Sequence, residues 1–198
     1  MAEPTIFAVI FLLCAFSERP SSTSFARSSS LISDMLMLSK IESGDAPIRA
    51  LSEVALEDIA KEVLDGLSEK AQSRNITANI VGSAKLTADQ TMIFELVENL
   101  VSNAIKYNKD GGSVTVSITE TDTGVCLKVE DTGIGIEKEH LPRLCERFYR
   151  VDKSHSKRIG GTGLGLAIVK HICAISDAEL SIESEFGVGT TVTVAFRK

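Results

Sequence analysis

The sequence predicts an α+β fold in which an antiparallel-rich sheet carries its helices on one face. Segments with helical spacing of apolar residues occur in separate blocks, and segments that alternate apolar with polar residues follow one another through short turns. The 198 residues allow one ordinary domain plus a tail, and 43% hydrophobic residues are enough for a packed core.

The first 30 residues are predicted to be a flexible leader. Residues 5–16 form a nearly unbroken apolar run, shorter than the ~20 residues that a membrane span requires. Only Glu3 is charged before this run, whereas a secretory signal begins with positive charge. A signal peptide or membrane anchor stays open as the alternative, and membrane association of this chain is not expected. The serine-rich residues 17–30 are typical of a linker.

A helix over 31–44 is predicted next, because Leu31, Met35 and Leu38 lie on one helical face before Gly44 and Pro47. A short strand is then expected over residues 48–52. An amphipathic helix of about five turns begins at Leu56 and ends at Arg74-Asn75, followed by a strand over residues 76–81.

The remaining elements alternate between helix and hairpin. A second long helix is expected from Asp89 to about Lys106, a short helix near residues 137–148, and a third long helix over residues 164–175. Strands with period-two alternation are expected over residues 114–118, 125–129, 179–184 and 190–196, with turns at residues 108–112, 121–124 and 187–189.

The helix over 89–106 has a polar face whose residue types are unusual for the interior of a helix. Glu95, Asn99, Asn103 and Tyr107 recur every four residues, beside Lys106. Asparagine is a poor interior helix residue, and its amide oxygen can ligate Mg²⁺ without adding charge. An ordinary solvated face is the alternative.

Two glycine-rich segments follow. Asp131 ends a strand before Gly133 and Gly135, and a carboxylate at a strand end can accept a hydrogen bond from an exocyclic amine such as that of adenine. An ordinary Asp-Gly turn is the alternative. Residues 160–166 lead into the third long helix, where clustered backbone N–H groups are predicted to form an anion site. A flexible glycine-rich loop without a ligand is the alternative. The spacing fits neither a dinucleotide-binding fold nor a P-loop.

Charge and side-chain chemistry narrow the classes of function. Residues 143–158 contain six Lys or Arg against two acids, in a chain whose net charge is −6. This local surplus suits a flap over a polyphosphate, or a solvated loop, while the acidic total argues against nucleic-acid binding. The four cysteines have no disulfide or zinc spacing, which fits a reducing cytoplasm, and the three histidines form no metal cluster with them.

In this order, the motifs resemble those of the ATP-binding catalytic domain of two-component sensor histidine kinases. Residues 98–107 resemble the N box, residues 131–135 the first glycine box, residues 146–152 the F box and start of the ATP lid, and residues 161–171 the second glycine box. The resemblance covers roughly residues 48–198 and extends to DNA gyrase, the large heat-shock chaperone and the mismatch-repair ATPase. It implies a Bergerat-type two-layer sandwich, with a mixed, mainly antiparallel sheet on three helices.

The resemblance also implies roles and cofactors, ATP and Mg²⁺. Asn103 would ligate Mg²⁺, Asn99 would lie near the phosphates, and Lys106 and Arg150 would contact phosphate; Asn99, Lys106 and Arg150 would form the catalytic set. Asp131 would recognise adenine by accepting a hydrogen bond from its amino group. The further nucleotide-binding residues that it implies are Tyr107, Gly133, Ile134, Gly135, Phe148, Gly161, Thr162, Gly163, Leu164 and Gly165.

Two departures from the family pattern matter. Cys145 stands where the F box usually begins with phenylalanine, so the lid is expected to pack less firmly. Residues 31–44 resemble only the end of the second dimerisation helix, and no histidine precedes His140. Residues 1–27 match nothing in the family. We therefore expect that the acceptor histidine lies in a dimerisation domain supplied in trans, that a response regulator is an indirect partner, and that the chain does not label itself.

Three alternatives remain. A gyrase-type ATPase would need a carboxylate base where Asn99 stands. A serine kinase of the anti-sigma type would share the nucleotide motifs, although the helix over 31–44 speaks against it. A nucleotide-binding module without turnover is the non-enzymatic alternative.

Overall fold

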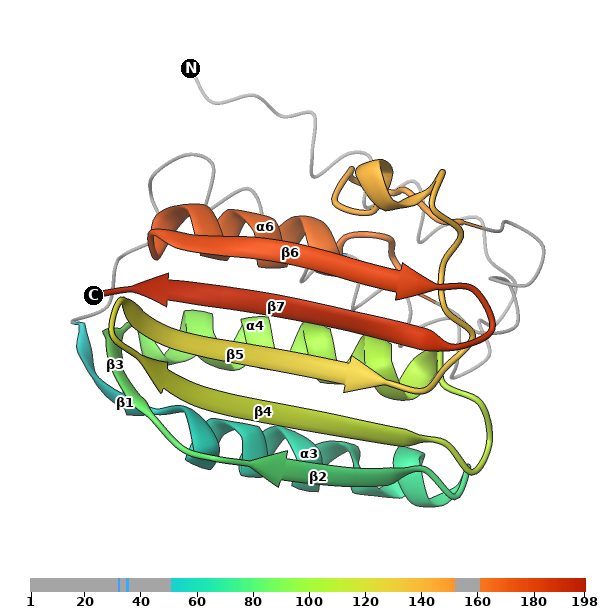
Figure 1. Ribbon diagram of the computed structural model, residues 1–198, viewed down its shortest axis with the longest axis horizontal. Helices are drawn as coiled ribbons and strands as arrows, with labels where there is room; N and C mark the ends of the chain where they lie inside the picture. The colour runs from blue at the N-terminus through green and yellow to red at the C-terminus, as the bar shows by residue number, and fades with distance from the viewer. Residues whose placement is uncertain (1–31, 33–34, 36–50, 152–160) are drawn as a thin grey trace, which may run out of the picture.

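The computed structural model describes residues 32, 35, 51–151 and 161–198, and shows a two-layer α+β domain (Figure 1). A five-stranded sheet has the order β2-β4-β5-β7-β6, and a two-stranded sheet joins β1 to β3. The described elements are β1 (Ser52–Ala55), α3 (Leu56–Gln72), β2 (Thr77–Val81), β3 (Lys85–Ala88), α4 (Gln90–Lys106), β4 (Ser113–Thr121), β5 (Gly124–Asp131), the 3₁₀ turn η1 (Leu141–Arg143), α6 (Gly165–Ile175), β6 (Ala178–Glu185) and β7 (Gly189–Arg197).

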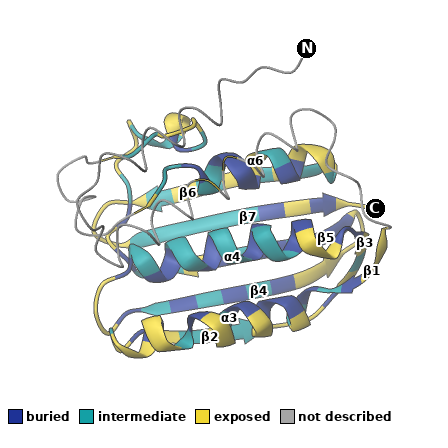
Figure 2. Ribbon diagram, turned by 180° about the vertical axis from the view of Figure 1, so that it is seen from behind, coloured by how far each residue is buried: buried dark blue, intermediate teal, exposed yellow. Residues whose placement is uncertain are grey.

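The predicted fold class is confirmed. In the large sheet, β2 pairs parallel with β4 and every other pair is antiparallel, so the sheet is mixed and mainly antiparallel. Helices α3, α4 and α6 cover one face of it (Figure 2). None of the helices in the described ranges combines the length and apolar character that a membrane span needs.

Helix α4 packs at the centre of the domain and carries most of the predicted site. Asp89 caps it, because its Oδ1 accepts hydrogen bonds from the backbone N–H groups of Thr91 and Met92. The apolar side of α4 is fully or almost fully buried at Ile93, Leu96, Val97, Leu100, Val101 and Ile105. The opposite side is therefore left to present the polar residues of the site.

The strands are fixed by the alternation that predicted them. Val114, Val116 and Ile118 of β4 and Val125, Leu127 and Val129 of β5 are buried against the helices, while their neighbours in the strands, apart from Gly124, are not. Val116 pairs with Val129, and Asp131 pairs with Val114. Asp131 is the last residue of β5.

Three expectations need correction. The first strand runs over Ser52–Ala55, and residues 48–50 lie outside the described part. Strand β3 was not predicted; it is four residues long and gains its order by pairing with β1. The helix near residues 137–148 is only one 3₁₀ turn, because its amides bond three residues back and only Leu144 is buried there.

The other expected helices and hairpins are present within a few residues. The leader over residues 1–30 lies outside the described residues, as does the helix over 31–44 except for Ile32 and Met35, which are helical and exposed.

Candidate functional site

The two asparagines of α4 lie against the first turn of α6. A Cβ built on Gly165 would lie 2.5 Å from Asn99 Oδ1 and 3.8 Å from Asn103 Nδ2. Asn99 Nδ2 donates to the carbonyl of Glu95 at 2.9 Å, which holds the amide in place. The missing side chain at Gly165 thus brings two amides to a helix N-terminus, where backbone N–H groups favour an anion.

One turn further along α4, Lys106 and Tyr107 face the other end of the second glycine segment. A Cβ on Gly161 would clash with Lys106 Nζ and lie 3.9 Å from the Tyr107 hydroxyl. The Lys106 ammonium lies 5.0 Å from the centre of the Tyr107 ring. Burial raises the pKa of the Tyr107 phenol, and the positive charge of Arg150 partly opposes the rise. The Lys106 ammonium and a half-buried phenol therefore lie beside Gly161, and the charge of Arg150 acts on that phenol.

Asp131 is held at the edge of the same site. Its Oδ1 accepts a hydrogen bond from the backbone N–H of Gly133 at 2.8 Å. Burial raises the pKa of this carboxyl, while hydrogen bonds from the backbone of Gly133 and Thr190 work in the opposite direction. The half-buried carboxylate keeps further acceptor capacity, since each oxygen has two lone pairs.

The glycines after Asp131 have close neighbours within the chain. A Cβ on Gly133 would lie 2.5 Å from the carbonyl oxygen of Tyr107, which also accepts from Ile134 N at 3.1 Å. Gly135 has φ +64°, and a Cβ there would clash with the carbonyl of Glu185. These glycines join the loop to α4 and to the β6–β7 turn, a reason for them that sequence reasoning missed.

The F-box segment and the second glycine segment are bonded to each other. Phe148 N donates to the carbonyl of Gly163 at 2.9 Å, and both residues have positive φ, +61° and +74°. Positive φ is rare for a residue as bulky as phenylalanine. Leu164, which is fully buried, donates its N–H to Thr162 Oγ1 at 3.2 Å. The predicted residues on both sides of residues 152–160 are thus together, while residues 152–160 lie outside the described part.

Aromatic and ionic contacts hold the segment on either side of Phe148. The Tyr149 hydroxyl lies 2.7 Å from His140 Nδ1, and the Arg143 guanidinium lies 4.3 Å from the Tyr149 ring centre. Arg143 also bonds Glu146. Cys145 is half-buried here, and burial raises the pKa of its thiol. The looser lid expected from Cys145 stays a prediction.

Sequence reasoning missed the residue that fixes the C-terminal end of α4. Arg74 donates to the carbonyls of Ile105 at 2.9 Å, Lys106 at 3.1 Å and Asn108 at 2.6 Å. It also forms an ion pair with Asp110 at 2.8 Å. The sequence pattern indicates only that a helix ends at Arg74. No local pattern could connect this residue to partners more than 30 residues away.

These features match a known family. The model of the histidine kinase-, DNA gyrase B- and HSP90-like ATPases matches residues 88–198, and the chain belongs to that family. Within it, the chain carries a catalytic domain of the protein-histidine kinase class.

The particular relatives are sensor kinases. The chain is 38% identical over 172 residues to the phosphate regulon sensor protein PhoR of Pseudomonas aeruginosa, covering 86% of this chain and 39% of that protein. It is 34% identical over 171 residues to the sensor-like histidine kinase SenX3 of Mycolicibacterium smegmatis, covering 85% of this chain and 44% of that protein. It thus spans about two fifths of the length of these relatives.

A solved structure agrees in fold. The mycobacterial sensor histidine kinase MprB superposes with a TM-score of 0.65 at 24% identity, over 74% of this chain and 97% of that one. The family and the fold expected from the sequence are therefore confirmed.

Proposed function

We propose that this chain binds Mg–ATP beside α4 and donates the γ-phosphoryl group to a histidine of a dimerisation domain in trans. The observation that carries the proposal is the contact between the second glycine segment and α4. Gly161 and Gly165 leave open the space next to Lys106, Asn99 and Asn103 that a Cβ would fill. A polyphosphate needs such a cradle of backbone N–H groups and cations.

The side chains beside the second glycine segment have the chemistry that Mg²⁺ and the phosphates of ATP require. Asn103 supplies a hard oxygen for Mg²⁺, which usually completes its shell with water and phosphate. Lys106 and Arg150 supply positive charge for the phosphates, and Asn99 lies one helical turn before Asn103. The bound magnesium would neutralise charge on the transferred group, while these residues orient it.

The adenine end is proposed at Asp131. The carboxylate accepts from the adenine amino group, while Tyr107, Ile134 and Phe148 contribute apolar surface around it. Ile134 and Phe148 are 49% and 54% exposed, so a flat ring has apolar surface to cover.

A water-activating ATPase is the less well supported of the two candidate enzymatic functions. Such an enzyme needs a general base near the attacking water, and an amide cannot take up a proton. Asn99 occupies that position, and its Nδ2 is committed to the carbonyl of Glu95. Transfer to a protein histidine needs no such base for water, and a response regulator would then receive the phosphoryl group. Use of ATP places the proposed reaction in the cytoplasm.

The experiment combines two measurements on the whole chain. ATP binding is measured by calorimetry with and without Mg²⁺, and transfer is measured with γ-labelled ATP and an added histidine-containing dimerisation domain. Lys106→Ala is expected to weaken both, whereas Lys109→Ala, an exposed lysine in the following turn, serves as the matched control. Label on the added domain and none on the chain is expected. Binding without transfer would favour a module without turnover, and absence of ATP binding would refute the proposal.

A further inference from the structure

The first glycine segment, residues 131–135, lies between the end of α4 and the β6–β7 turn. On the α4 side, the carbonyl of Tyr107 accepts a hydrogen bond from Ile134 N at 3.1 Å. On the other side, Gly187 N donates to the carbonyl of Ile134 at 2.7 Å. These two bonds join main-chain atoms, and they fix the middle of the segment from both sides.

The Ser184 hydroxyl adds a side-chain link between the β6–β7 hairpin and the end of this segment. Ser184 is half-buried, and its Oγ accepts a hydrogen bond from Ile136 N at 2.9 Å. The same Oγ donates to the carbonyl of Gly189 at 2.8 Å and lies 2.8 Å from Thr190 Oγ1. A hydroxyl has one proton to donate and two lone pairs. Because the proton goes to Gly189, Thr190 Oγ1 is the donor in the last pair, and the Ser184 hydroxyl makes all three of its hydrogen bonds.

Both partners of Ser184 on β7 contact Asp131. Thr190 pairs with Asp131 across the sheet, and its backbone N–H donates to the carboxylate. A Cβ on Gly189 would clash with the carbonyl oxygen of Asp131, so the two main chains touch. Ser184 is therefore connected to Asp131 through the start of β7, and to the residue that follows the glycine segment through Ile136 N.

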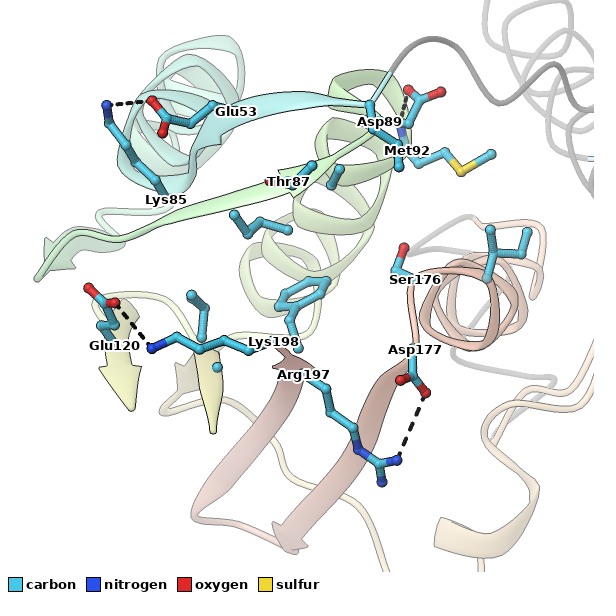
Figure 3. Close-up of a pocket in the computed structure, with 17 residues that line it drawn as sticks. Glu53, Lys85, Thr87, Asp89, Met92, Glu120, Ser176, Asp177, Arg197 and Lys198 are labelled. Atoms are coloured by element: carbon cyan, nitrogen blue, oxygen red, sulfur yellow. Dashed lines mark hydrogen bonds and ion pairs between the residues drawn. The ribbon is translucent and has the colours of Figure 1, made fainter. Parts of the chain in front are cut away.

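The other end of the same hairpin is held in a different way. There Arg197 of β7 pairs with Asp177, just before β6, at 3.9 Å beside a cavity of about 580 Å³ (Figure 3). Their side chains are 64% and 84% exposed, and ion pairs so open to water add little stability. The half-buried hydroxyl network lies instead at the end of the hairpin that touches Asp131. Its place suits the positioning of this carboxylate better than general support of the hairpin.

We propose that Ser184 is a positioning residue for the adenine end of the candidate site. Its hydroxyl connects Ile136 to the start of β7 and thereby fixes the direction of the Asp131 carboxylate, which recognises the exocyclic amino group of the base. Ser184 acts through Asp131 and does not contact the base itself. A hydrogen bond weakens steeply as its angle departs from linear, so a carboxylate held in one direction binds the amino group more tightly than one that is free to turn. This role rests on the proposed function, because it needs adenine to bind at Asp131.

Calorimetric titrations of Ser184→Ala test this role with two nucleotides. The affinity for Mg–ATP is expected to fall about fivefold, which is the usual effect of one hydrogen bond. Purine riboside triphosphate has a hydrogen in place of the amino group, so its affinity should be the same in the parent and in the variant. Ser184→Thr keeps the hydroxyl and is expected to recover most of the ATP affinity. Ser181→Ala, at an exposed serine of the same strand, is the control and should bind both nucleotides as the parent does.

Two results of these titrations would overturn the proposal. Unchanged ATP affinity in Ser184→Ala would show that the hydroxyl does not position Asp131. Equal losses for ATP and for purine riboside triphosphate would show that the substitution loosens the whole site instead of the recognition of the amino group.

Hydrogen exchange in the chain without nucleotide tests the same link independently of ATP. The amide of Ile136 is expected to exchange about tenfold faster in Ser184→Ala, because it loses its acceptor. The amide of Val194, fully buried in the middle of β7, should keep its rate and serves as the internal control. Absence of ATP binding by the parent chain would refute the proposed function and this inference together. An unchanged rate at Ile136 would refute only the inference.

Discussion

The guanidinium of Arg74 donates a hydrogen bond to the main-chain oxygen of Asn108 at 2.6 Å, across the end of α4. The same group bonds the carbonyls of Ile105 and Lys106. The last carbonyls of a helix have no partner within the helix, and a cation there also interacts favourably with the helix dipole. Arg74 therefore holds the end of α4 from which Lys106 and Tyr107 reach the candidate site.

Arg74→Ala is expected to lower the free energy of unfolding by about 2–3 kcal/mol, because it leaves several carbonyls without a charged donor. ATP affinity should also fall, although Arg74 does not line the proposed nucleotide site. Arg74→Lys should recover little of the lost stability and ATP affinity, since one ammonium cannot replace the several donors of the planar guanidinium. Urea unfolding and calorimetry measure both effects, and Lys61→Ala is the control. Full stability of Arg74→Ala would contradict this role.

Asp131→Asn is expected to weaken ATP binding and to leave the empty protein at least as stable as before at pH 7. The raised pKa of Asp131 means that the fold favours the protonated carboxyl. Its contribution to stability is present below the ordinary pKa of 3.8 and is lost as pH rises through the higher folded pKa. The uncharged amide of asparagine still provides an acceptor for Gly133 N, and it avoids the free-energy cost of burying a charged carboxylate. Thermal melts and titrations with ATP and GTP test this, and equal losses for both nucleotides would speak against adenine recognition.

Gly161→Ala is expected to weaken ATP binding by roughly tenfold, which corresponds to about 1.4 kcal/mol. The added methyl group would displace the Lys106 ammonium, and φ +134° is unfavourable for alanine. Gly187→Ala is the matched control, since its φ is +83° but its Cβ would meet nothing within 4 Å. The control should lose stability with unchanged ATP affinity. A similar loss of ATP affinity in both variants would mean that backbone strain, not displacement of Lys106, is the cause.

Asn103→Asp is expected to change the Mg²⁺ dependence of ATP binding. A carboxylate adds a charged ligand for the metal and, at low Mg²⁺, repels the phosphates. ATP affinity should therefore fall in the absence of Mg²⁺ and recover partly as Mg²⁺ is added. Asn79→Asp, on the exposed side of β2, controls for the change in net charge. An identical Mg²⁺ titration in the parent and in Asn103→Asp would remove Asn103 from the metal site.

Cys173 is expected to be alkylated slowly in the folded chain. It is buried in α6, and burial, with a contribution from Cys145, raises its pKa to about 11 from an ordinary value of 9.0. Since the folded pKa is the higher one, the stability that this thiol contributes is present below pH 9 and is lost as pH rises through about 11. Mass spectrometry after iodoacetamide treatment at pH 8 should find Cys173 modified at the rate of global unfolding. Rapid modification without urea would contradict its burial.

Local patterns were sufficient for the long elements and for much of the candidate site. The helices α3, α4 and α6 and the hairpin β4–β5 follow from periodicities that operate within a few residues. The same periodicity put Asn99 and Asn103 on one face, and turn residues put Asp131 at a strand end. These features depend on backbone geometry, which neighbouring residues set.

Other features depend on residues far apart in the chain. Strand β3 exists through its pairing with β1, and β2 lies parallel to β4, which the short turns between neighbouring strands did not predict. Arg74 meets the end of α4 only after the sheet forms, and Gly135 is needed because Glu185 approaches it from another hairpin. The periodicity of the chain could not specify these contacts, since their strength comes from burial and hydrogen bonding between segments that only the folded domain brings together.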